Sequence, residues 1–148
     1  MSDEEEYTID IPEELNVEKG PYVVEIQTMK LIEDKKGNKN VVITSEIVEG
    51  PYKGARVTDW IGQSKELPFG VQQMNANKLN SFMVACTEGE TDFDRKLKFT
   101  RTDSDELVNA SVEGLVVGVH LTTNNGYLNV DRKGYFPSSE MADDEEPF

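Results

Sequence analysis

Cysteine and histidine are almost absent from this sequence, which has one of each, Cys86 and His120, in 148 residues. A single cysteine excludes an internal disulfide, and a single histidine with so few partners does not provide the ligands of a zinc site. Cys86 ends an apolar helical pattern, so we expect its thiol to be buried. No apolar run reaches membrane-spanning length, and the acids of residues 3–6 replace the positive start of a signal peptide. We therefore expect a soluble, metal-free cytoplasmic protein without cofactors.

Catalytic motifs are also missing. The sequence has no P-loop, no GxSxG, no HExxH and no second histidine to act as a base beside a nucleophile. Asp92, Asp94, Asp103 and Asp105 could pair as Mg²⁺ ligands, but they fall in polar segments where solvated acids are the rule. We therefore expect a protein that is not an enzyme.

Basic residues are lacking at both ends of the chain. Residues 1–18 hold eight acids and residues 140–148 hold five, and neither segment has a lysine or arginine. The net charge is -14, yet the middle of the chain is nearly neutral because it carries all 15 basic residues. Such ends predict an acidic N-terminal segment at 1–18 and a disordered acidic tail at 138–148. Overall acidity therefore does not exclude a nucleic-acid ligand for the middle domain.

Three short strands are predicted in the first half of that domain, at residues 22–32, 41–48 and 55–61, with turns at 34–39 and 49–54. Strands joined by tight turns are typical of an antiparallel meander. Apolar residues alternate along them, which predicts one buried face that includes Tyr22, Val24, Ile26, Val41, Ile43 and Ile47.

The second half changes period. Residues 72–85 have helical spacing, residues 96–100 suggest a short strand, and Ser104 could cap a helical turn that ends at Leu107. The last part of the domain is predicted to form a hairpin. Apolar residues alternate strictly over 115–121, Asn124–Gly126 forms a turn, and the chain returns over 127–136. Three strands, a helix and a hairpin are the element order of an OB-fold. We expect a mainly β domain over residues 19–137, a five-stranded antiparallel barrel with one helix between strands 3 and 4.

In an OB-fold the ligand lies on strands 2 and 3, between the loops that join strands 1 to 2 and 4 to 5. These predicted elements, with the closing strand, collect cations and aromatic rings, the two components of single-strand binding. The candidates are Lys35, Lys36, Lys39, Tyr52, Lys53, Arg56, Trp60, Tyr127 and Arg132. Each also has a plainer interpretation: the lysines as solvated turn residues, Trp60 as core, and Tyr22 or Tyr135 as a cap on the barrel.

Four segments carry a resemblance to a known family: GPYVVEI from Gly20, DKKGN from Asp34, IVEGPYKG from Ile47 and GYFP from Gly134. Over residues 19–137 the chain resembles a family of small phage-encoded OB-fold proteins, some of which are regarded as single-stranded-DNA-binding proteins of the replication module. Ser45 departs from this family, which tends to have a large apolar residue there. The resemblance implies an OB-fold that binds single-stranded DNA in the cytoplasm of the host.

The C-terminal residues carry a second, independent resemblance. Acidic residues are followed by Pro-Phe, as in the tails of bacterial and phage single-stranded-DNA-binding proteins, where the tip recruits replication and repair enzymes. The resemblance implies a partner-binding tail formed by Asp143, Asp144, Glu145, Glu146, Pro147 and Phe148. The same polyanion could also lie in the protein's own cationic groove.

The sequence thus predicts a protein that coats and protects single-stranded DNA during phage replication or recombination and recruits partners through its tail. Two alternatives stay open: an acidic protein-binding module that mimics DNA or inhibits a host nucleic-acid enzyme, and a nuclease, which would need a metal site. The oligomeric state is also open, with a homo-oligomer as one alternative.

Overall fold

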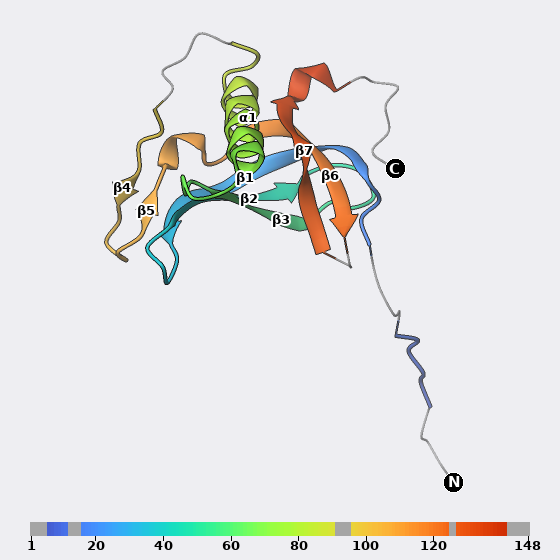
Figure 1. Ribbon diagram of the computed structural model, residues 1–148. Helices are drawn as coiled ribbons and strands as arrows, with labels where there is room; N and C mark the ends of the chain where they lie inside the picture. Colours follow the sequence, from blue (N-terminus) through green and yellow to red (C-terminus); the bar gives the residue numbers. More distant parts are fainter. Residues whose placement is uncertain (1–5, 12–15, 91–95, 125–126, 142–148) are drawn as a thin grey trace.

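The computed structural model describes residues 6–11, 16–90, 96–124 and 127–141, and these residues form a mainly β domain with one α-helix (Figure 1). The helix α1 covers Phe69–Cys86. The strands are β1 (Gly20–Glu33), β2 (Lys39–Ile47), β3 (Arg56–Gly62), β4 (Thr100–Arg101), β5 (Leu107–Val108), β6 (Val116–Asn124) and β7 (Tyr127–Pro137). Two single-turn 3₁₀ helices, η1 (Ala110–Val112) and η2 (Ser138–Glu140), complete the described elements.

Strand β1 is the element that joins the two halves of the sheet. One of its edges pairs antiparallel with β2 from Val24 to Glu33, and a register shift between Ile26 and Thr28 interrupts that ladder. Its other edge pairs with β6 from Gly20 to Glu25 and with β5 at Lys30 and Leu31. A bulge of this kind bends and twists a strand, so the two ends of β1 can serve differently directed parts of one sheet.

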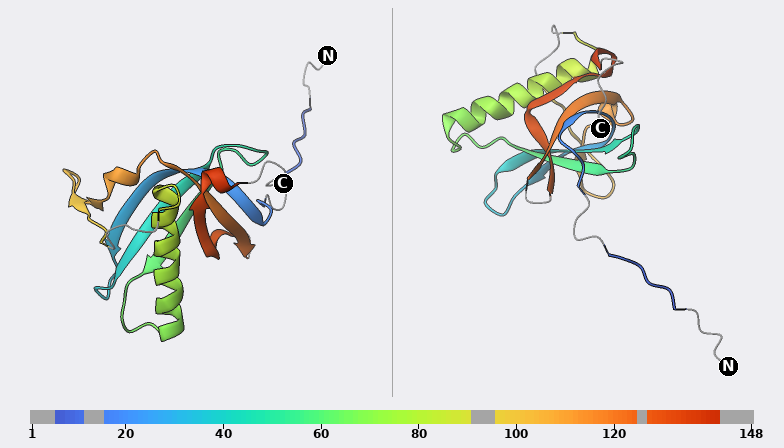
Figure 2. Two further views of the ribbon diagram at one scale, coloured as in Figure 1. Left: turned by 90° about the horizontal axis from the view of Figure 1, so that it is seen from above. Right: turned by 90° about the vertical axis from the view of Figure 1, so that its right-hand side faces the viewer.

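The sheet is antiparallel and open. Its order is β3-β2-β1-β5-β4, with β6 on β1 and β7 on β6. The expected barrel differs from this in two respects. Within the described residues no strand pairing joins β3 to β7 to close the sheet, and β4 and β5 add a short hairpin to the five long strands. Figure 2 shows the strands curving around a common interior with α1 on one side.

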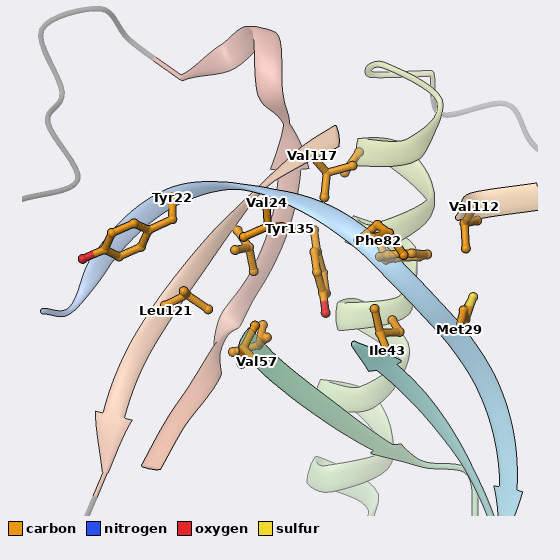
Figure 3. Packing of buried hydrophobic residues seen from close by; sticks show 14 of the residues in the cluster. Tyr22, Val24, Met29, Ile43, Val57, Phe82, Val112, Val117, Leu121 and Tyr135 are labelled. Atoms are coloured by element: carbon orange, nitrogen blue, oxygen red, sulfur yellow. The ribbon is translucent and has the colours of Figure 1, made fainter. Parts of the chain in front are cut away.

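The core lies between the curved sheet and α1. The inward faces expected from alternation are confirmed, since Tyr22, Val24, Ile26, Ile43 and Ile47 are fully buried. Phe82 of α1 packs edge-on against Tyr135 of β7, with ring centroids 5.0 Å apart. Figure 3 shows both rings among the apolar side chains of β1, β3 and β6. One helix thus covers the interior of the sheet.

Helix α1 is longer at its start than the predicted 72–85. Pro68 fixes a suitable backbone angle just before the helix, and its carbonyl accepts hydrogen bonds from the amides of Val71 and Gln72. Its buried residues, Lys78, Phe82 and Ala85, lie on one stripe of the helix. Cys86 is half-buried against the core, and burial raises the pKa of its thiol to about 12.

Two local expectations were wrong. Ser104 does not cap a helical turn; it lies in the turn of the β4–β5 hairpin, where Thr100 pairs with Val108. The strand expected at 96–100 is reduced to Thr100–Arg101. At the C-terminus, η2 continues regular structure beyond Pro137 into the predicted 138–148 tail, and half-buried Met141 follows it. The acids of that tail from Asp143 onward lie outside the described residues.

Candidate nucleic-acid interface

The outer face of β1, β2 and β3 is a continuous surface that points away from the core. Cross-strand register places Lys30, Val42 and Trp60 in one row, because Val42 pairs with both of the others. A second row consists of Thr28, Thr44 and Thr58. We call these two rows, with Glu46 and Arg56 beside them, the outer face. It offers an aromatic ring, hydroxyl groups and cations, all of which can contact a nucleic-acid strand.

Trp60 is the exposed aromatic of this face. Along β3 the buried residues Val57, Asp59 and Ile61 alternate with exposed ones, and 58% of Trp60 is accessible. The alternative that Trp60 belongs to the core is therefore wrong. Its cross-strand neighbour Val42 is only 4% exposed and supplies an apolar side chain on the same face. A large exposed ring beside an apolar side chain suits stacking against a flat, partly apolar group.

Arg56 lies on the same face of β3 as Trp60, four residues earlier in the strand. Its Nε donates to Glu46 Oε1 over 3.1 Å, and 70% of the arginine side chain is exposed. Exposed ion pairs of this kind contribute about 0–1 kcal/mol, so a phosphate can compete with the carboxylate for the guanidinium. Lys30, which the sequence pattern did not suggest, donates to Glu106 over 2.6 Å. That hydrogen bond lowers the pKa of Glu106.

Three candidate lysines lie in or beside the β1–β2 turn, at one end of these strands. Lys35 and Lys36 lie exposed in the β1–β2 turn, and Lys39 is exposed at the first position of β2. The Asp34 carboxylate accepts from the amides of Lys36 and Asn38, at 2.9 Å each, and so fixes the turn. Gly37 has φ +83°, a conformation that favours glycine at the tip.

Tyr52 and Lys53 lie at the opposite end of β2, in the β2–β3 loop. β2 has nine residues, so roughly 30 Å separates the two loops at the usual rise per residue. Lys53 is exposed, but Tyr52 is half-buried and packs edge-on against Tyr22, with centroids 6.0 Å apart. The structure thus places Tyr52 at the end of the core, where the sequence alternatives had put Tyr22, and not on the outer face.

Tyr127 and Arg132 come from β7, which has no pairing with β3 in the part of the chain that the structure describes. Tyr127 begins the strand and is 74% exposed. Arg132 lies in the irregular stretch between the Val130 and Tyr135 pairings, just before Gly134, which closely approaches Ser81 of α1. The candidate set therefore comes from several elements, and among the described residues no hydrogen bond or ion pair joins Arg132 to Trp60.

Below the outer face, a buried polar network holds β3. Asp59 accepts from Lys78 Nζ at 3.2 Å and from the Tyr135 hydroxyl at 3.0 Å, which links β3, α1 and β7. Burial raises the pKa of Asp59, although the Lys78 ammonium opposes the shift, and burial also raises the pKa of Tyr135. Sequence reasoning missed this network. The sequence feature that could have predicted the network was Asp59, an acid at an inward position of β3 between Val57 and Ile61.

Metal-binding clusters and membrane-spanning helices are both absent from the described ranges. These residues contain no group of three or more metal-ligating side chains, and Asp92 and Asp94 lie outside them. None of the described helices is long and apolar enough to span a membrane. The tail residues Asp143, Asp144, Glu145, Glu146, Pro147 and Phe148 also lie outside the described part of the chain, so their predicted role stays a prediction.

Residues 8–147 match a family described as a protein of unknown function (DUF669). The chain belongs to the DUF669 family. The matched DUF669 region includes the whole outer face and nearly all of the acidic tail. No curated protein matches the chain.

Proposed function

We propose that this protein binds single-stranded DNA without catalysing a reaction, and that it coats and protects strands during phage replication or recombination. The observation that carries the proposal is the placement of Trp60, a 58% exposed ring on the outer face, on the same strand as Arg56. Single-strand binding without sequence preference combines bases stacked on aromatic rings with a cationic path for the backbone.

The arrangement of charge supports this proposal over a DNA mimic. A mimic would display carboxylates across its folded surface, whereas 13 of the 29 acids lie in residues 1–18 and 140–148. On the outer face the carboxylate of Glu46 is paired with Arg56, and Glu106 beside it is paired with Lys30. The three lysines at 35, 36 and 39 extend the positive charge at one end. A phosphate backbone would find net attraction there.

We further propose that the open sheet is of the OB type and that the acidic tail recruits replication or recombination proteins in the cytoplasm of the host. The long shared strand β1, the meander β1–β3 and the β6–β7 hairpin support the OB assignment. A tail that ends in Phe148 offers a ring and a carboxylate to a basic, apolar pocket on a partner.

A fluorescence titration tests the proposal, because Trp60 is the only tryptophan in the chain. Addition of oligo(dT) should quench its emission as bases stack on the ring. Trp60→Ala, followed by anisotropy of a labelled oligo, should lose about 1–3 kcal/mol of binding free energy. The melting temperature should change little, since most of the ring is exposed.

Trp60→Phe provides the matched control, because it keeps a ring and should retain most of the affinity. Duplex DNA of equal length should compete poorly for the protein. If the protein binds neither oligo(dT) nor other single strands at low salt, the proposal fails, and the acidic protein-binding module becomes the better interpretation.

A further inference from the structure

The N-terminal residues 6–11, which we call the arm, expose three large apolar side chains. Tyr7, Ile9 and Ile11 are between 73% and 88% exposed, and the arm lies drawn out away from the sheet and α1 (Figure 1). Side chains of an extended chain alternate between two faces, so these three share one face, and Glu6 and Asp10 lie on the other. Apolar side chains gathered on one exposed face are typical of a surface that another protein covers.

A groove of about 430 Å³ lies between α1, the segment 96–100 that leads into β4, and η1. Its lining includes Met83, Leu97 and Val112, whose side chains belong to the core or pack against it. Lys96 and Lys98 also line the groove, and both are exposed. In the described part of the chain β4 pairs with β5 alone, so its other edge is open. The groove thus combines an apolar lining with positive charge beside an open strand edge.

The arm and the groove complement each other in charge as well as in polarity. Residues 1–18 hold eight acids and no base, whereas residues 96–101 hold three bases and no acid. An apolar face of the arm suits the apolar lining, and long lysine side chains can reach carboxylates that remain in water. Opposite charges on two surfaces also favour their encounter and fix their register.

The position of the arm favours a groove in another molecule. The carbonyl of Val17 accepts a hydrogen bond from Thr123 Oγ1 over 2.7 Å, which anchors the base of the arm near the end of β6. Val112 in the groove precedes the start of β6 at Val116, about 23 Å from Thr123 along the strand. Ile11 is six residues before Val17 and reaches at most about 22 Å from it. Only a fully stretched chain would bring Ile11 back to the start of β6.

We propose that the arm of one copy of this protein docks in the groove of a second copy. The apolar face of the arm covers Met83 and Leu97, and Asp10 lies near Lys98. This is the binding of an extended peptide beside a strand edge, with side-chain pockets that give specificity. One short segment buries little area, so the association is weak and depends on protein concentration. It does not depend on DNA.

Sedimentation of the full-length protein without DNA, over a range of concentrations, tests the proposal. The average mass should rise with concentration, and added salt should reduce the rise. Ile9→Asp should weaken the association about tenfold or more, because it replaces a buried apolar side chain with a charge. Thr8→Asp is the matched control: it adds the same charge on the opposite face of the arm and should leave the association nearly unchanged.

A charge exchange tests the groove itself. Lys98→Glu should weaken the association several-fold, and Asp10→Lys in the same chain should restore it. Lys36→Glu makes the same charge change in the β1–β2 turn, outside the groove lining, and should have little effect.

Both a dimer and a longer series of copies would support the proposal, provided that Ile9→Asp reduces them. A monomer at every concentration would overturn it. Loss of association with Lys98→Glu but not with Ile9→Asp would also overturn it, because a segment other than the arm would then fill the groove. None of these results depends on whether the protein binds single-stranded DNA.

Discussion

Arg56 and Glu46 face each other across β2 and β3, and their ion pair decides how much positive charge the outer face offers to a strand. Arg56→Gln should reduce the slope of log K against log salt by about 0.7, the contribution of one phosphate contact to single-strand binding. Glu46→Gln removes the competing carboxylate and should strengthen binding. Both slopes are measured by titrating a labelled oligo(dT) at several salt concentrations.

Arg56→Gln should weaken DNA binding and Glu46→Gln should strengthen it, although both substitutions remove the same surface ion pair. Their effects on folding should be alike and below about 1 kcal/mol, because exposed pairs contribute little to stability. Parallel losses of DNA affinity in both variants would mean that the ion pair organises the sheet, and that Arg56 does not contact phosphate.

In the β6–β7 ladder, Gly118 pairs directly with Phe136. A Cβ at residue 118 would lie 2.1 Å from the Phe136 ring, so the ring can occupy its place only over a glycine. We expect Gly118→Ala to destabilise the fold by about 1–3 kcal/mol, the usual cost of overpacking. Urea unfolding measures the change.

Gly70→Ala is the matched control for that change. A Cβ at Gly70 would meet nothing within 4 Å, and the residue lies in the first turn of α1. The substitution should be neutral or stabilise the fold by up to about 1 kcal/mol, because alanine favours helix and reduces the entropy of the unfolded chain. Equal effects of the two alanines would contradict the packing argument.

Lys78 holds α1 to β3 through Asp59, and both side chains are almost inaccessible. We expect Lys78→Met to cost about 3–5 kcal/mol at neutral pH, since it leaves a buried carboxylate without its partner. The folded pKa of Asp59 is already raised, and loss of the ammonium that lowers it should raise it further. The folded state then binds the proton more tightly than the unfolded state, so stability falls as pH rises between the two pKa values.

The free energy of unfolding that Lys78→Met loses relative to the unmodified protein should therefore be small near pH 4 and grow toward pH 7. Urea unfolding across that pH range measures it. The double variant Asp59→Asn, Lys78→Met carries neither charge and should show no such growth. A deficit that is constant with pH would assign the role of Lys78 to packing of its aliphatic chain.

The sequence predicted the long strands and their inward faces because alternation with period two records burial directly, as at Val117, Val119 and Leu121. It could not predict β4 and β5, since two-residue strands carry no periodic signal. It also missed the Asp59–Lys78 pair, because no local pattern relates residues that meet only when α1 packs on β3. The prediction that Tyr52 belongs to the binding surface has a similar cause. The sequence shows that Tyr52 lies in a loop, but it does not show the contact between Tyr52 and Tyr22.

On the scale of the whole molecule, charge is divided between a nearly neutral body and two acidic ends. Regular structure runs to η2, so a clean truncation should remove residues 142–148 and leave Met141. This deletion takes away four acidic side chains together with Pro147 and Phe148. If the tail competes for the outer face, the truncated protein should bind oligo(dT) more tightly at low salt, and the difference should shrink as salt screens the charges.

Phe148→Ala distinguishes recruitment from competition. It removes the ring and keeps every acid, so DNA affinity should match that of the full chain, while partner proteins captured from phage-infected cells should be lost. If the same partners are recovered with full-length protein and with Phe148→Ala, the terminal ring is incidental, and the tail acts through its charge alone.

The central position of β1 has a consequence for the time at which the protein can fold during synthesis. Gly20 pairs with Leu121, and Glu25 pairs with Val116, so the N-terminal end of β1 waits for residues made about a hundred positions later. Until β6 leaves the ribosome, the N-terminal part of β1 has no partner on one of its edges, and β7 has not yet been made to cover the apolar face of the β1–β3 meander. Long-range pairing of this kind slows folding and prolongs the interval in which a nascent chain can associate with its neighbours.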